Sequence, residues 1–156
     1  MNHPGIEPNI DSRSGMNVLD WAISAENCET VKAVLESHKF IRDPSGKEVS
    51  SVQLAISRGN PEVLKTLINE KMLRVNEIFE NEITPLHLAS IYDSVAIVEY
   101  LCQQSDVNVN SIDAGGRTPL HHAASEGFLE IVKILIKIPG IQLDIEDMDY
   151  VFFYIL

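Results

Sequence analysis

A six-residue block recurs along this chain every 33 or 34 residues, and no other feature of the sequence constrains the fold as strongly. The block TPLHLA at 84–89 returns as TPLHHA at 118–123, and related blocks occupy 17–22 and 50–55. Twelve residues after the alanine that ends each block stands an aliphatic residue: Val34, Leu67, Leu101 or Leu135. The chain is therefore predicted to consist of internal repeats, which bury their apolar faces only by stacking on their neighbours.

Each repeat is predicted to form a helix, a turn, a second helix and an extended, hairpin-like connection. Every block begins with Asn, Ser or Thr, whose side-chain oxygen caps a helix N-terminus. Pro85 and Pro119 fit the first helical position, where a missing N–H costs nothing. Gly59 and Gly127 follow the first helix, where a left-handed residue ends it. The second helix carries an apolar stripe, as at 131–136. Extended connections are expected at 73–76, 107–110 and 142–145.

Three features identify the family that these repeats resemble. They are Thr-Pro-Leu-His near an alanine, the stretch 127–133, and Asp113 before the turn glycines. On these residues the sequence resembles an ankyrin-repeat protein. The resemblance implies an all-α fold, a solenoid of stacked helix-turn-helix units with β-hairpin-like connecting loops. The ankyrin-repeat domain is expected over 12–146, divided into repeats 12–44, 45–78, 79–112 and 113–146.

The two ends of the chain depart from the repeat pattern. Residues 1–11 are expected to form a flexible N-terminus, and 147–156 a truncated fifth repeat or an apolar tail. Six consecutive apolar residues, 151–156, stand where the next helix start would need a polar cap. Three interpretations of this tail stay open: truncation, covering of the fourth repeat, or binding to a partner or a second copy. We expect the tail to cover the fourth repeat and the chain to be a monomer, with self-association through 151–156 as the alternative.

The charge of the chain is strongly acidic and unevenly distributed. There are 23 acidic and 12 basic residues, which gives a net charge of −11, and only three of the basic residues lie in 79–156. Nucleic acids and anionic membranes are disfavoured as partners because both require clustered cations. The excess of acidic residues forms either a face that attracts a basic partner or an ordinary solvated surface. No apolar run is long enough to span a membrane. With two cysteines, a reducing compartment is expected: the cytoplasm, with the nucleus as the alternative.

No set of residues predicts catalysis, a metal site or a cofactor. His87 and His121 occupy equivalent positions one repeat apart, too far to share one zinc ion, and the resemblance implies that each bonds the backbone and the threonine of its own motif. Cys28 and Cys102 are expected to pack as apolar residues instead of acting as nucleophiles. The glycines at 115–116 lack the lysine of a phosphate-binding loop. We therefore expect a protein that is not an enzyme.

The resemblance implies a non-catalytic protein–protein interaction module: an adaptor, scaffold or inhibitor. Its partner would bind the concave face formed by the hairpins and the inner helices. In the third repeat Ile83, Ile91 and Tyr92 are expected to form an apolar centre flanked by Glu80 and Glu82. This suits a partner with a basic and apolar epitope. The family's recognition positions correspond here to Glu80, Asn81, Ile83, Ile91, Tyr92, Arg117, Ser125, Glu126, Arg58 and Lys47.

Other functions stay open at this stage. By resemblance, Asn76 and Asn110 match a hairpin asparagine that is hydroxylated in this family, so the chain could be the substrate of an asparaginyl hydroxylase. It could also be the cytosolic ankyrin segment of a longer channel or scaffold, or an effector directed at a host cell.

Overall fold

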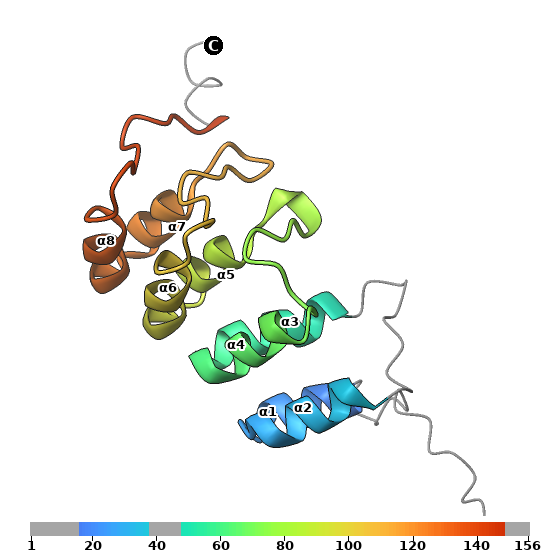
Figure 1. Ribbon diagram of the computed structural model, residues 1–156. Coiled ribbons are helices and arrows are strands. Elements are labelled where there is room, and N and C mark those ends of the chain that lie inside the picture. Colours follow the sequence, from blue (N-terminus) through green and yellow to red (C-terminus); the bar gives the residue numbers. More distant parts are fainter. Residues whose placement is uncertain (1–15, 38–47, 149–156) are drawn as a thin grey trace, which may run out of the picture. The chain divides into compact units, whose positions relative to one another are not determined.

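The computed structural model describes residues 16–37 and 48–148 (Figure 1). The N-terminal segment 1–11, Lys47 and the tail 151–156 lie outside these residues, so their expected roles stay predictions. The described residues contain eight α-helices, one short 3-10 helix and no strand, which confirms the all-α class. Two compact units are distinguished. One runs up to Ala55 and includes Glu62–Leu73; the other contains Ile56–Pro61 and the chain from Arg74 onward.

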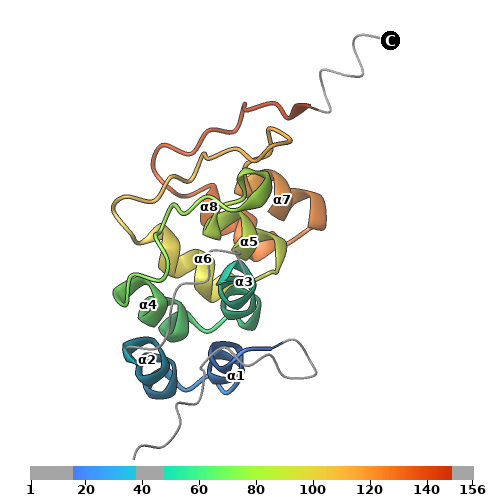
Figure 2. The same ribbon diagram turned by 90° about the vertical axis from the view of Figure 1, so that its right-hand side faces the viewer.

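The helices pair in chain order, as the helix-turn-helix prediction requires. The first unit contains α1, α2 and most of α3 and α4, with bounds Val18–Ser24, Cys28–Glu36, Glu48–Arg58 and Pro61–Asn69. The second contains the 3-10 helix η1 and α5 to α8, with bounds Glu80–Glu82, Pro85–Ile91, Val95–Cys102, Pro119–Glu126 and Leu129–Leu135. Within it α5 packs on α6 and α7, and α8 packs on α6 and α7 (Figure 2). First helices thus stack on first helices, and second helices on second helices.

In the first unit Asp20 occupies the position that histidine holds in the third and fourth repeats. Its carboxylate accepts a hydrogen bond from the Asn17 backbone N–H at 2.9 Å, and its own N–H donates to Asn17 Oδ1 at 2.9 Å. The two residues therefore close a capping box at the start of α1. The same carboxylate accepts a hydrogen bond from Ser51 Oγ on α3. Asp20 thus takes the place of the expected histidine in the capping box and also joins the first repeat to the second.

Each turn between the two helices of a repeat contains one residue in the left-handed region. Gly59 and Gly127, which the sequence predicted there, have φ of 71° and 75°. The first and third repeats place Glu26 and Asp93 at the same point, with φ of 52° and 53°. A residue with a Cβ is disfavoured in this region, so sequence reasoning found only the glycine turns. The packing of the helices sets the conformation of the other two.

The core follows the twelve-residue spacing in three repeats out of four. Leu67, Leu101 and Leu135 are fully buried. Val34 is only half-buried, whereas Val31 in the same helix is fully buried. The connections expected to be extended contain turns at 75–76 and 109–110. Asparagine side chains that bond to the next connection hold these turns, as described below.

Two buried serines in the second unit differ in how their hydroxyls are satisfied. Ser94 Oγ donates to the Ile56 carbonyl at 2.7 Å, whereas Ser90 Oγ is buried with no hydrogen-bond partner among the described residues.

Leaving a buried hydroxyl unpaired costs about 1–3 kcal/mol. Ser90→Ala should therefore raise the free energy of unfolding by about 1 kcal/mol, and Ser94→Ala should lower it by a similar amount. Urea unfolding of both variants checks this; equal losses for both would contradict the assignment.

Candidate functional site

Three of the expected binding residues of the third repeat, Glu80, Asn81 and Ile83, lie on a tight turn that leads into α5. The Phe79 N–H donates to the Ile83 carbonyl at 2.8 Å, and Asn81 between them takes a left-handed φ of 57°. Glu80 and Asn81 are exposed at the tip, whereas Ile83 is half-buried at its base. The Asn81 carbonyl accepts a hydrogen bond from the Ala114 N–H at 2.9 Å. The tips of the third and fourth repeats are thus bonded to each other.

Asp113 organises the corresponding turn of the fourth repeat. Its N–H donates to the Arg117 carbonyl at 2.9 Å, and its Oδ1 accepts from the backbone N–H groups of Gly115 and Arg117, each at 2.9 Å. Its Oδ2 lies 2.8 Å from His122 Nε2. Burial of Asp113 opposes ionisation, but the Arg117 N–H, the His122 ring and the Gly115 N–H together lower the pKa of this carboxyl below its ordinary value. The turn is therefore built on an ionised carboxylate.

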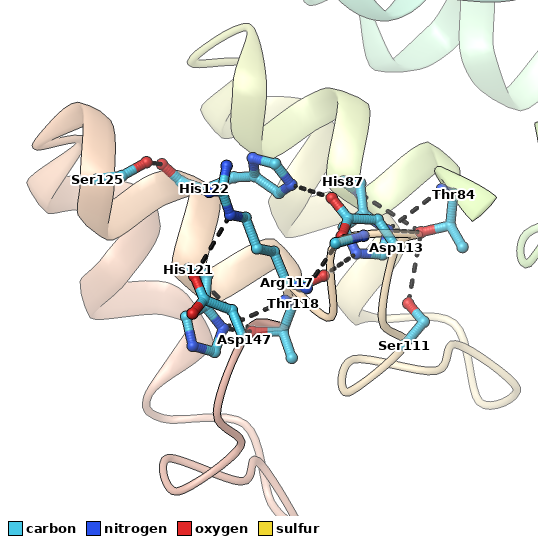
Figure 3. Close-up of polar contacts among 11 residues, drawn as sticks. Thr84, His87, Ser111, Asp113, Arg117, Thr118, His121, His122, Ser125 and Asp147 are labelled. Carbon is cyan, nitrogen blue, oxygen red and sulfur yellow. Dashed lines mark hydrogen bonds and ion pairs between the residues drawn. The ribbon is translucent and has the colours of Figure 1, made fainter. Parts of the chain in front are cut away.

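The motif histidines act inside the fold, as the sequence predicted. His87 Nδ1 lies 2.8 Å from Thr84 Oγ1, and His121 Nδ1 lies 2.8 Å from Thr118 Oγ1, so each threonine and histidine form a capping box. His87 Nε2 also donates to the Arg117 carbonyl at 2.9 Å, one repeat further on. Burial lowers the pKa of His87, against the opposing effect of the Arg117 carbonyl. Figure 3 shows these contacts together with the Asp113–His122 pair.

The ends of the first helices present the remaining expected positions. Ile91 ends α5 and is half-buried, and Tyr92 follows it with 44% of its surface exposed. Ser125 and Glu126 are exposed in the last turn of α7, where Ser125 Oγ donates to the His122 carbonyl at 3.0 Å. The Ser125 hydroxyl is thus used within its own helix.

The two arginines of the expected surface differ in their surroundings. Arg58 is exposed at the end of α3. Arg117 forms an ion pair with Asp147, with Nε 3.4 Å from Oδ2. The next residue, Met148, donates its N–H to the Gly115 carbonyl at 2.9 Å. The segment that begins a fifth turn therefore lies along the fourth and shares the Arg117 charge.

Asn76 and Asn110 join successive connections by the same pair of hydrogen bonds. Asn76 donates to the Asp106 carbonyl at 2.6 Å and accepts from the Asn108 N–H at 2.8 Å. The Asn110 side chain donates to the Gly140 carbonyl at 2.8 Å and accepts from the Gln142 N–H at 2.9 Å. Both amides thus have a role in the folded state. Their hydroxylation stays a prediction.

Two exposed residues next to the expected surface were not predicted from the sequence. Ile78 and Ile112 precede the turns of the third and fourth repeats and have 70% and 48% of their surface exposed. They are 34 residues apart, so the repeat period was the signal that could have found them. Exposed aliphatic residues at equivalent positions of adjacent repeats extend the apolar part of the surface.

The described residues give no support for a reactive centre. Burial raises the pKa of the Cys102 thiol to about 11, which keeps it protonated and unreactive. Cys28 is half-buried at the first position of α2. Within the described ranges no three His, Cys, Asp or Glu side chains come together as a metal site. Over the same residues, none of the helices has the length and hydrophobicity to cross a bilayer.

Comparison with known proteins identifies a family for this chain. A family model described as ankyrin repeats, in three copies, matches residues 52–147. No curated protein matches the sequence. The matched range contains α5 to α8 and every expected binding residue except Lys47.

The asparagine contacts predict a loss of stability on mutation. Asn110→Ala removes two hydrogen bonds between neighbouring connections and should lower the free energy of unfolding by about 1–2 kcal/mol. Asn108 offers a matched control, because its side chain accepts one hydrogen bond, from the Asn110 N–H at 3.2 Å. Asn108→Ala should therefore cost less. Thermal unfolding of both variants measures the difference, and a larger loss for Asn108→Ala would refute this role of Asn110.

The lowered pKa of Asp113 predicts a pH dependence of stability. The carboxylate stabilises the fold above its ordinary value of 3.8, and this contribution is lost as the pH falls through the lower pKa of the folded state. Asp113→Asn should cost about 1–3 kcal/mol near neutral pH. The difference between the two proteins should shrink as the pH is lowered from about 5 to about 2. Urea unfolding across this range tests it; a constant difference would show that the charge has no part.

Proposed function

Because this chain belongs to the ankyrin-repeat family, whose repeats generally serve as protein–protein interaction modules, we propose that it is a non-catalytic adaptor, scaffold or inhibitor. Its partner protein binds the tip surface, which we define as the turns and first-helix ends of the second unit. The tip surface comprises Ile78, Glu80, Asn81, Ile83, Ile91, Tyr92, Ile112, Arg117, Ser125 and Glu126.

One observation carries this proposal: large apolar side chains are exposed on the tip surface although the core does not need them. Ile78, Tyr92 and Ile112 are exposed, while the core between α5 and α8 is filled by other residues: Leu86, Leu88, Ile97, Val98, Leu101, Ile131 and Leu135. Tyrosine is among the residues that most often dominate interface energies, because it buries a large area with few rotatable bonds. Exposed apolar residues among charged ones are the usual composition of such an interface.

The charges around these residues indicate what kind of partner fits. Between Arg74 and Arg117 the chain contains no lysine or arginine. Exposed acidic residues lie in this stretch: Glu80, Glu82, Asp93, Glu99 and Asp106. Arg117 is itself paired with Asp147. A partner segment that combines apolar side chains with lysine or arginine therefore complements the tip surface, and its charge would chiefly accelerate association.

The hydrogen bonds beneath the tip surface favour binding by preorganising it. The Asn81 carbonyl is bonded to the Ala114 N–H, and the Asp113 carboxylate closes the next turn. Residues held in one geometry before binding lose little conformational entropy when a partner arrives. The two turns can thus act as one platform.

The experiment is affinity capture from a cell lysate with quantitative mass spectrometry. The baits are the wild-type chain, Tyr92→Ala, and the double variant Ile78→Ala, Ile112→Ala. A specific partner should be enriched on the wild-type bait and at least about tenfold less on the variants, the effect of losing an interface hot spot. Purified partner and calorimetry then give the affinities.

The matched control is Ile136→Ala, which removes a side chain of similar exposure, 47%, from the end of α8, outside the tip surface. It should capture the partner as well as the wild type does. Equal recovery on all baits would place the binding site elsewhere, and no specific enrichment on any bait would reject the interaction function.

A further inference from the structure

The fourth repeat departs from the third at one buried position. His122 stands 34 residues after Leu88, which is buried in α5. The His122 ring packs edge-on against His87, with ring centroids 5.7 Å apart and planes at 83°. His87 is fully buried, and His122 is half-buried. A second titratable ring has thus been placed in the contact between α5 and α7.

The hydrogen bonds of His87 require a neutral ring with its proton on one particular nitrogen. The Thr84 backbone N–H donates to Nδ1, at 3.2 Å, so Nδ1 must be an acceptor. The proton therefore lies on Nε2, which donates to the Arg117 carbonyl at 2.9 Å. A second proton on this ring would occupy Nδ1 and remove the acceptor that closes the cap of α5.

The charges near the two rings compensate for only one proton. Asp113 accepts from His122 at 2.8 Å and can balance a positive charge on that ring. If both rings were protonated, two positive charges would lie 5.7 Å apart beside one carboxylate. Arg117 contributes its carbonyl, while its guanidinium pairs with Asp147. The other titratable or charged groups of the packed helices α6, α7 and α8 include His121, Glu126, Glu99, Tyr100, Cys102, Glu130 and Lys133.

We propose that His87, His122 and Asp113 form a pH-responsive joint between α5 and α7, so that mild acid opens the fourth repeat ahead of the rest of the second unit. In the closed joint His87 stays neutral. When α7 separates from α5 and α8 from α6, the His87 ring gains access to water and takes up a proton. Opening is thereby linked to the binding of one proton, and acid favours the open form.

Hydrogen exchange of the wild-type chain tests this linkage without any partner. After correction for the intrinsic exchange rates, the equilibrium constant for opening of α7 and α8 should rise about fivefold between pH 6.5 and 5.5. This is the effect of one linked proton on a ring whose pKa in the open form is the ordinary 6.5. The amides of α1 and α2 should change much less. Opening that does not depend on pH, or that rises equally in α1 and α2, would overturn the proposal.

A pair of variants distinguishes the joint from general acid sensitivity. The double variant His87→Gln, His122→Leu removes both rings and restores the leucine found at Leu88. Its α7 and α8 amides should lose most of the pH dependence, measured as the ratio of opening at the two pH values within each protein. His121→Gln, which changes the equivalent motif histidine of the fourth repeat, should keep it. Loss of the pH dependence in His121→Gln would assign the proton to that residue instead.

A spectroscopic measurement on the wild type gives an answer even if the double variant fails to fold. Ring nitrogen chemical shifts report the protonation state and tautomer of each histidine. At pH 6, while α7 amides remain protected, His87 should be neutral with its proton on Nε2. A doubly protonated His87 in the protected state would overturn the proposal.

The consequence for binding rests on the proposed function, because opening would displace Arg117, Ser125 and Glu126 from the tip surface. The exchange and chemical-shift experiments involve no partner. A failed joint would leave capture by the tip surface unaffected, and a failed capture would leave the proton linkage unaffected. The two hypotheses are thus tested separately.

Discussion

Burial between neighbouring repeats is the constraint on which the rest of this structure depends. Helices of seven or eight residues, such as α5 and α6, are too short to be stable in water by themselves. They persist because α5 packs on α7 and α6 on α8. Ala89 and Ala123 are fully buried, and a small residue at this point lets two helices approach closely. Stability therefore resides in the contacts between repeats as much as in the repeats themselves.

Apolar contacts are not directional, so a small number of polar bonds set how one repeat is positioned on the next. His87 reaches from the cap of α5 to the Arg117 carbonyl of the following turn. Asn76 and Asn110 each bond two backbone groups in the next connection. In the first unit Asp20 and Ser51 make the corresponding contact. Each bond joins residues about one repeat apart, which ties the spacing of the motif to the geometry of the stack.

The same polar bonds connect the core to the surface where binding is proposed. Asp113 holds its turn through two backbone N–H groups and faces His122 on the other side. A turn fixed in this way presents its side chains in one arrangement, and a carboxylate between backbone and imidazole makes that arrangement sensitive to protonation. Recognition and pH response can therefore share residues in the fourth repeat without a separate regulatory element.

The sequence by itself determined the repeat period, the helix caps at Asn17, Thr84 and Thr118, and the left-handed glycines, because each is a local preference repeated at a fixed interval. The cap predicted at Ser50 was wrong, because α3 begins at Glu48 and contains Ser50. The structural role of His87 followed from the resemblance to the ankyrin family. The resemblance also placed Tyr92 on the surface. Only the tertiary structure decided that Glu26 and Asp93 adopt left-handed turns, that Arg117 pairs with Asp147, and that His122 packs on His87. The physical reason is that these features depend on how packed helices and turns meet. Residues about thirty positions apart come into contact only when the repeats stack. Local sequence preferences therefore do not predict which residues of neighbouring repeats will meet.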